Sequence, residues 1–384
     1  MELSIGLQIS MLLFFALFGY LIALKINQSA VVGVMVVGII VGPSFFGFID
    51  YTEFVEALAH IGAIVLLFAI GLEFKLREVY SIKYTFIAVG GVIVPWISGY
   101  FLAVFFGYSF IESILIGTAL VATSIAITAS VLLEMGKINT SIAKAIIGAA
   151  VVDDILSLIA ISIVTQMTHG GTDVVAIIVM VTKALLFVGG GIFIGKYVRG
   201  IFVRLDGKDI AKKFPDFLFI MAMAVAFFYS FLAELIDLSG IIGAFIAGST
   251  LAGMKLKTSK DLKEGAEYMH IIFGAIFFIS LGVLADVRAL SIDVVLFLTA
   301  LIIVAVISKI IGCYLPAKLS GMSSNEAMAV GIGMVPRGEV GMIVGVIGLT
   351  SGAISQSIYV SIIIMSIVTT IITPMALRKF FDKT

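Results

Sequence analysis

Two adjacent acids, Asp153 and Asp154, lie in the apolar run Ala-Val-Val-Asp-Asp-Ile-Leu-Ser-Leu. They follow Lys144 by about nine residues, which is roughly 14 Å along a helix. Adjacent helical residues point about 100° apart, so one carboxylate can face an aqueous cavity while the other pairs with a cation. Such a pair can bind a small cation or protons. If the run spans a membrane, carboxylates at that depth mark a functional site.

Further charges lie in two other apolar runs. Lys309, in Val-Ile-Ser-Lys-Ile-Ile, is a candidate counter-charge for an aspartate, although a purely structural ion pair is also compatible with its position. The segment 334–341 reads Met-Val-Pro-Arg-Gly-Glu-Val-Gly and holds Arg337 and Glu339. Its proline and glycines predict a break in a helix. Arg337 can bind the carbonyl ends exposed at such a break, and Glu339 can bind the amide ends. Both are therefore interpreted as a scaffold that supports crossed broken helices rather than as carriers of the ion.

The elements that must position these residues are membrane helices. Of the 384 residues, 61% are hydrophobic and 12% are charged, and the net charge is zero. Soluble proteins carry about 25% charged residues. The composition therefore excludes soluble enzymes and disordered chains, and nothing suggests a nucleic-acid partner. The single cysteine excludes an intrachain disulfide framework, and no cofactor site is indicated.

Continuous apolar runs predict thirteen transmembrane helices rather than barrel strands. The N-terminal run has no basic start and is interpreted as a retained first span. Twenty of the 24 Lys and Arg fall on one side if the N-terminus is outside and the C-terminus cytoplasmic. No stretch is long enough for a separate soluble domain. The spans are 3–24, 29–48, 54–73, 82–106, 111–133, 140–166, 173–197, 213–235, 239–253, 267–285, 292–315, 324–350 and 354–378.

A weak internal repeat relates the two halves of the chain. The segments 31–38 and 241–248 match at an offset of 210 residues, and similar matches recur at offsets of 211 and 214. The displacement is seven helices, an odd number, so the copies have opposite orientation. We therefore predict one transmembrane domain over 1–384 with inverted repeats near 1–170 and 213–380 and a connecting helix near 173–197. A chance pattern of glycines in apolar helices is the alternative.

The repeat predicts a second broken helix. The counterpart of the 334–341 break is Val-Ala-Thr-Ser-Ile-Ala-Ile-Thr at 121–128. The hydroxyls of Thr123, Ser124 and Thr128 can satisfy freed backbone groups or ligate a cation. Paired broken helices at corresponding positions of two repeats indicate a transport site.

These motifs together resemble the monovalent cation:proton antiporter-2 family, and most closely its NapA-type prokaryotic sodium/proton antiporters. The resemblance covers nearly the whole chain and implies an NhaA/NapA-like fold with crossed broken helices. It also implies a homodimer in the cell membrane and elevator-like movement of a core domain. In such a protein Asp154 exchanges sodium (or lithium) for protons, Asp153 pairs with Lys309, and Thr123 and Ser124 help to bind the ion. Sodium would therefore be bound by Asp154 and Asp153.

The Asp-Asp pair resembles the electrogenic members, which move two protons per sodium. Potassium/proton exchange on the same fold remains an alternative. A cation channel or a membrane sensor is an alternative of another class, although paired broken helices favour a carrier. An organic-anion symporter is disfavoured because paired acids would repel its substrate.

Overall fold

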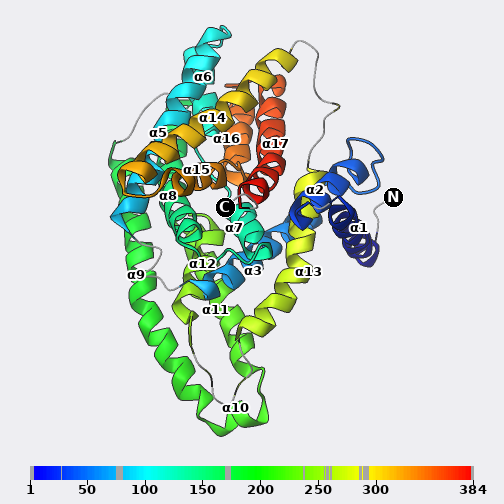
Figure 1. Cartoon of the computed structure of the whole chain (residues 1–384), viewed down its shortest axis with the longest axis vertical. Helices are drawn as coiled ribbons and strands as arrows, with labels where there is room; N and C mark the ends of the chain where they lie inside the picture. Colours follow the sequence, from blue (N-terminus) through cyan, green and yellow to red (C-terminus); the bar gives the residue numbers. More distant parts are fainter. Residues whose placement is uncertain are drawn as a thin grey trace. The chain divides into compact units, whose positions relative to one another are not determined.

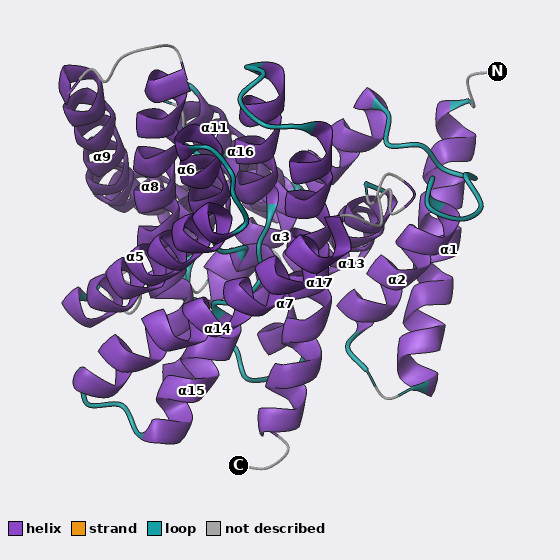
Figure 2. Ribbon diagram, turned by 90° about the horizontal axis from the view of Figure 1, so that it is seen from above, coloured by secondary structure: helices purple, strands orange, loops and turns teal. Residues whose placement is uncertain are grey.

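The computed structural model describes residues 4–26, 28–74, 81–168, 174–236, 238–254, 256, 259, 262–284, 288 and 294–381. Some side chains within the helices, including that of Glu339, lie outside this description. Every regular element in the described part of the chain is a helix (Figures 1 and 2). Apolar helices satisfy their own backbone hydrogen bonds, which is the requirement that a lipid environment imposes.

Eight helices in the described ranges are long and apolar enough to cross a membrane, and shorter apolar helices lie between them. The chain is thus an all-helical, multi-pass membrane protein. The number thirteen and the inverted repeats stay predictions. The helices are α1 (Ile5–Lys25), α2 (Ala30–Val41), α3 (Glu53–Glu73), α5 (Ile82–Phe105), α6 (Phe110–Ala119), α7 (Ile125–Glu134), α8 (Ser141–Thr168), α9 (Val174–Asp206), α10 (Asp209–Lys213), α11 (Phe217–Glu234), α12 (Gly240–Leu251), α13 (Leu262–Val283), α14 (Val295–Leu319), α15 (Ser324–Gly333), α16 (Glu339–Thr350) and α17 (Gln356–Phe381).

The helix boundaries differ from the sequence prediction in two informative places. α9 continues to Asp206, well beyond the expected end at 197, because residues 198–206 contain no proline and a single glycine, so nothing in their local chemistry ends the helix. The span expected at 213–235 begins later, as α11 at Phe217, and a separate short helix, α10, precedes it and ends before Pro215. A proline disfavours helical dihedrals in the residue before it, so α10 ends at Lys213.

The described residues form two compact units, each considered by itself. The first unit comprises 1–51, 81–177 and 279–384, and the second comprises 52–80 and 178–278. In the first, α5 packs against α14, α6 and α8, while α16 packs against α6 and α17. All four segments named as functional by the sequence lie in this unit, on α6–α7, α8, α14 and α15–α16. In the second, α3 packs on α12, which packs on α11.

Close glycine contacts recur in a pattern that supports the predicted repeat. In the first unit, a Cβ atom on Gly38 would lie 2.9 Å from Gly282 Cα. In the second, a Cβ atom on Gly71 would lie 3.0 Å from Gly248 Cα. Gly38 corresponds to Gly248 at an offset of 210 residues, and Gly71 corresponds to Gly282 at an offset of 211. The two contacts are therefore equivalent under the predicted repeat. Small residues allow membrane helices to approach this closely.

A second pair of contacts follows the same relation. A Cβ atom on Gly33 of α2 would lie 2.2 Å from the carbonyl oxygen of Gly19 in α1. A Cβ atom on Gly243 of α12 would lie 2.2 Å from the carbonyl oxygen of Tyr229 in α11. Gly243 follows Gly33 by 210 residues, and Tyr229 follows Gly19 by the same number. The packing of α1 on α2 is therefore repeated by α11 on α12, within separate units.

The two half-helices α6 and α15 also begin alike. Each starts with a capping box, in which a serine side chain accepts a backbone N–H while a glutamate accepts the serine's own N–H. The pairs are Ser109 with Glu112 and Ser323 with Glu326. Each pair of corresponding residues is separated by 214 positions, which is one of the offsets found in the sequence.

Candidate ion-binding site

Two interrupted helices cross in the first unit. The first break separates α6 from α7 at residues 120–124, and the second separates α15 from α16 at 334–338. Pro336 and Gly338 explain the second break, since proline lacks an N–H and glycine tolerates non-helical dihedrals. The first break contains neither residue. It is bound to the second by a hydrogen bond from the Ser124 backbone N–H to the Pro336 carbonyl, at 2.8 Å.

Hydroxyl groups from the first broken helix satisfy carbonyls of the second. Thr123 donates to the Met334 carbonyl at 3.2 Å, and Thr128 donates to the Gly333 carbonyl at 2.6 Å. These carbonyls end α15 and have lost their helical donors. The hydroxyls of Thr123 and Thr128 therefore hold the crossing together, while any contribution of Thr123 to ion binding stays a prediction.

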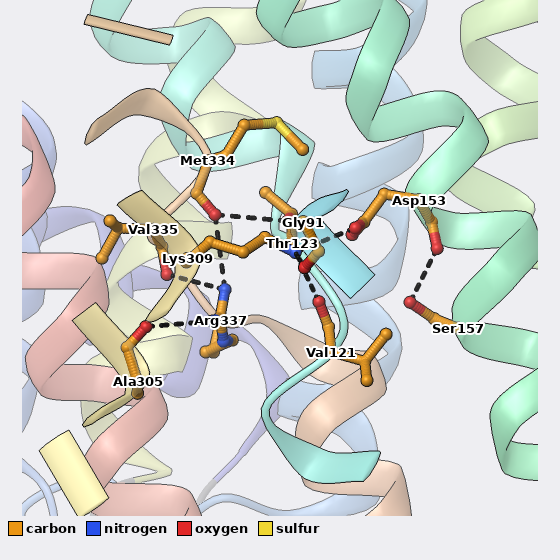
Figure 3. A network of polar contacts seen from close by, with 10 residues as sticks. All are labelled: Gly91, Val121, Thr123, Asp153, Ser157, Ala305, Lys309, Met334, Val335 and Arg337. Atoms are coloured by element: carbon orange, nitrogen blue, oxygen red, sulfur yellow. Dashed lines mark hydrogen bonds and ion pairs between the residues drawn. The ribbon is translucent and has the colours of Figure 1, made fainter. Parts of the chain in front are cut away.

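Lys309 lies at the centre of the polar network in Figure 3 and is fully buried. Its ammonium donates to the carbonyl of Gly91 at 2.7 Å, to the carbonyl of Val121 at 2.6 Å and to Asp153 Oδ1 at 2.8 Å. An ammonium has three N–H donors, so all three are used. Val121 lies in the first break, where a positive charge stabilises the carbonyl end of α6. Lys309 thus connects α14 to α5, the first break and α8.

The two acids occupy consecutive positions on α8. Asp153 is fully buried and pairs with Lys309, while its second carboxylate oxygen, Oδ2, makes no hydrogen bond in the described part of the chain. Ser157 donates to the backbone carbonyl of Asp153 at 2.7 Å, one turn along the helix. Asp154 is 5% exposed and points to a different side of α8. The two acids consequently have different surroundings, as their adjacency in the sequence requires.

Arg337 performs for the second break what Lys309 performs for the first. Its buried guanidinium donates to the carbonyls of Met334 and Val335 at 3.3 and 3.1 Å, and to that of Ala305 in α14 at 3.2 Å. Met334 and Val335 directly follow α15, so the charge again lies at a carbonyl end. Glu339 is the first residue of α16, and its side chain lies outside the described residues.

Several partners of these charges could not be identified from residue type. Thr369 accepts the backbone N–H of Arg337 and Thr370 donates to its carbonyl, which anchors the second break to α17. Gly91 binds Lys309 through its carbonyl alone. The sequence carried one indirect signal for Gly91, which is that Pro95 stands four residues later and cannot donate to it.

Long apolar helices, two crossed breaks and buried charges beside them are the features of a membrane transport protein. The model of the family "Sodium/hydrogen exchanger, transmembrane" matches residues 12–383. The chain therefore belongs to that family, and the resemblance read from its motifs is confirmed at the level of the family.

Curated relatives and solved structures agree with this assignment. The chain is 34% identical to a probable Na(+)/H(+) antiporter, GerT, of Bacillus cereus over 363 residues, which are 94% of this chain and 95% of the relative. It is 32% identical to the Na(+)/H(+)-K(+) antiporter GerN of the same organism over 384 residues, covering 99% and 97%. The fold is similar to that of the sodium proton antiporter MjNhaP1 from Methanocaldococcus jannaschii, with a TM-score of 0.75, 15% identity and coverage of 99% and 97%.

Proposed function

We propose that the protein is an electrogenic sodium (or lithium)/proton antiporter in which Asp154 exchanges sodium for protons. The observation that carries this proposal is the fully buried Asp153–Lys309 pair beside two crossed helix breaks. A buried ion pair next to a second acid is an arrangement in which a cation and a proton can compete. Membership of the sodium/hydrogen exchanger family and the named antiporter relatives support it.

The exchange begins from the state in which Asp153 is bound to Lys309. In that state Asp154 is the second acid of the pair, and it takes up protons or a cation in exchange. Sodium binds to oxygens of Asp154, with Thr123 and Ser124 of the first break nearby, and Asp153 leaves Lys309 to contribute to the site. Two protons displace sodium: one is taken up by Asp154 and one by the Asp153–Lys309 pair as it re-forms. The pair gave up that second proton when sodium bound, so two protons exchange for one sodium. The protons belong to the coupled group of charges rather than to one residue.

The helix crossing supplies the framework for this cycle. Hydrogen bonds from Thr123, Thr128 and the Ser124 backbone fix the two breaks to each other. The site therefore moves as one body, which suits an elevator-like movement of a core domain. We further propose a homodimer in the cell membrane with its N-terminus outside, its C-terminus in the cytoplasm and a role in pH homeostasis.

Reconstituted vesicles with an imposed pH gradient test the proposal. Sodium, lithium, potassium or rubidium is added in turn, with and without a clamped membrane potential, and the internal pH is followed. Sodium and lithium should dissipate the gradient, and Asp154→Asn should abolish this flux. Asp209→Asn is the matched control, because Asp209 lies on α10 with its side chain 90% exposed. Robust sodium-driven proton flux in Asp154→Asn would refute the site assignment.

Potassium/proton exchange is the second candidate, because the relative GerN is a Na(+)/H(+)-K(+) antiporter by name. The same vesicles distinguish the two candidates. Gradient dissipation by potassium and rubidium, but not by lithium, would replace the sodium assignment. Cation flux without proton movement would indicate a channel.

A further inference from the structure

A proline interrupts the hydrogen bonds of α5 at the level of Lys309. Pro95 lies inside this helix and has no N–H, so the carbonyl four residues earlier loses its helical donor. That carbonyl belongs to Gly91, and it accepts a hydrogen bond from Lys309 Nζ at 2.7 Å. Lys309 therefore supplies the hydrogen bond that the Gly91 carbonyl lacks because of Pro95.

The packing of α5 on α14 places this carbonyl within reach of Lys309. A Cβ atom on Gly90 would lie 2.2 Å from the Gly312 carbonyl oxygen, and one on Gly91 would lie 2.6 Å from Cys313 Sγ. The same Cβ atom on Gly91 would be 3.5 Å from Lys309 Cε. The absence of side chains on Gly90 and Gly91 thus lets the α5 backbone approach Lys309. The absence of an N–H on Pro95 leaves the Gly91 carbonyl free of a helical hydrogen bond, so it can accept one from the lysine.

We propose that Pro95 is a positioning residue for ion exchange, which keeps the Gly91 carbonyl available to Lys309 when Asp153 turns to the cation. This inference rests on the proposed function. Of the three acceptors of Lys309, the carbonyls of Gly91 and Val121 belong to the backbone, while Asp153 is a side chain that can move. The two carbonyls hold Lys309 Nζ in the sodium-bound state, because a lysine amine that has given up one proton keeps two N–H donors.

Pro95→Ala adds an N–H that competes with Lys309 for the Gly91 carbonyl. The sodium-bound state, in which Lys309 depends on the two carbonyls, is weakened more than the state with the ion pair intact. Loss of a single hydrogen bond predicts an apparent sodium KM about 2- to 12-fold higher, with a smaller change in the rate at saturating sodium. A restored helical hydrogen bond should not impair folding.

The experiment compares Pro95→Ala with Pro316→Ala in reconstituted vesicles. Pro316 lies in α14 of the same helix pair, and the carbonyl four residues before it is that of Gly312, which faces Gly90. Pro316→Ala should keep the parent sodium KM. The Pro95→Ala effect should vanish in a Lys309→Met background with residual flux, because methionine has no N–H to donate to the Gly91 carbonyl. If that background has no flux, sodium binding to it is measured by calorimetry instead.

Three results would overturn the inference while leaving the proposed function intact. They are an unchanged sodium KM in Pro95→Ala, an equal shift in Pro316→Ala, and an undiminished shift when Lys309 is replaced. Failure of both Pro95→Ala and Pro95→Ser to fold would also overturn it, since Pro95 would then serve the fold. Absence of sodium-driven proton flux in the parent protein would instead refute the proposed function.

Discussion

The energetic coupling between Asp153 and Lys309 can be measured with a double-mutant cycle. The variants are Asp153→Asn, Lys309→Gln and the two together, studied at one pH. Both side chains are fully buried and lie 2.8 Å apart, so each single change leaves a buried charge without its partner. Removal of one member of a buried pair costs about 3–5 kcal/mol. The double variant contains neither charge, so no buried charge is left without its partner.

The expected result is strong non-additivity. If the two residues were independent, the single costs would add to about 6–10 kcal/mol. We expect the double variant to be destabilised no more than either single variant, which corresponds to a coupling energy of about 3 kcal/mol or more. Lys309→Gln also loses bonds to the Gly91 and Val121 carbonyls. Because those losses occur in the single and the double variant alike, the cycle isolates the ion pair.

The assay is thermal unfolding in detergent at a fixed scan rate, since membrane proteins often unfold irreversibly. In a domain of 150–250 residues, 1 kcal/mol corresponds to about 2–4 °C. Each single variant should therefore melt several degrees below the parent, and the double variant should recover part of the loss. A fall in the double variant equal to the sum of the two single falls would refute the ion pair as a coupled unit.

Three further predictions concern the helix crossing. Arg337→Lys should lower the melting temperature and slow exchange, because one ammonium cannot replace a planar guanidinium that contacts the carbonyls of Met334 and Ala305 together. Unchanged flux and stability would contradict this. Thr128→Val should cost about 1–3 kcal/mol by leaving the Gly333 carbonyl unpaired, and Thr128→Ser, measured in the same melting assay, should restore most of it. Gly338→Ala should separate the two breaks, because its Cβ atom would lie 2.8 Å from Ser124 Cβ, so parent-like melting and sodium flux would show that the crossing is less tightly packed than described.

The sequence predicted what depends on local chemistry. The break around Pro336 and Gly338 follows from the two residues themselves, and α15 and α16 end and begin beside them. The break at 120–124 has no proline or glycine, and it could be predicted only through the repeat. The position of Lys309 in an apolar run identified it as a buried charge needing a partner.

What the sequence could not supply was the identity of backbone partners. Carbonyls of Gly91, Val121 and Ala305 bind the two buried cations, and any residue type carries such a group. Their availability depends on helix ends, on a proline and on close helix approach. Tertiary structure determines which carbonyls meet a cation, so motif spacing gives no direct access to them.

The long sequence separation of these partners has a consequence for biosynthesis. The Val121 carbonyl is bound by a residue 188 positions later, and Thr123 binds one 211 positions later. At about 5–20 residues per second, the first broken helix leaves the ribosome roughly 10–40 s before its partners exist. Its two ten-residue halves are each about 15 Å long, too short to cross the apolar layer alone. During that interval the first break lacks the hydrogen bonds that Lys309 and the second break later supply.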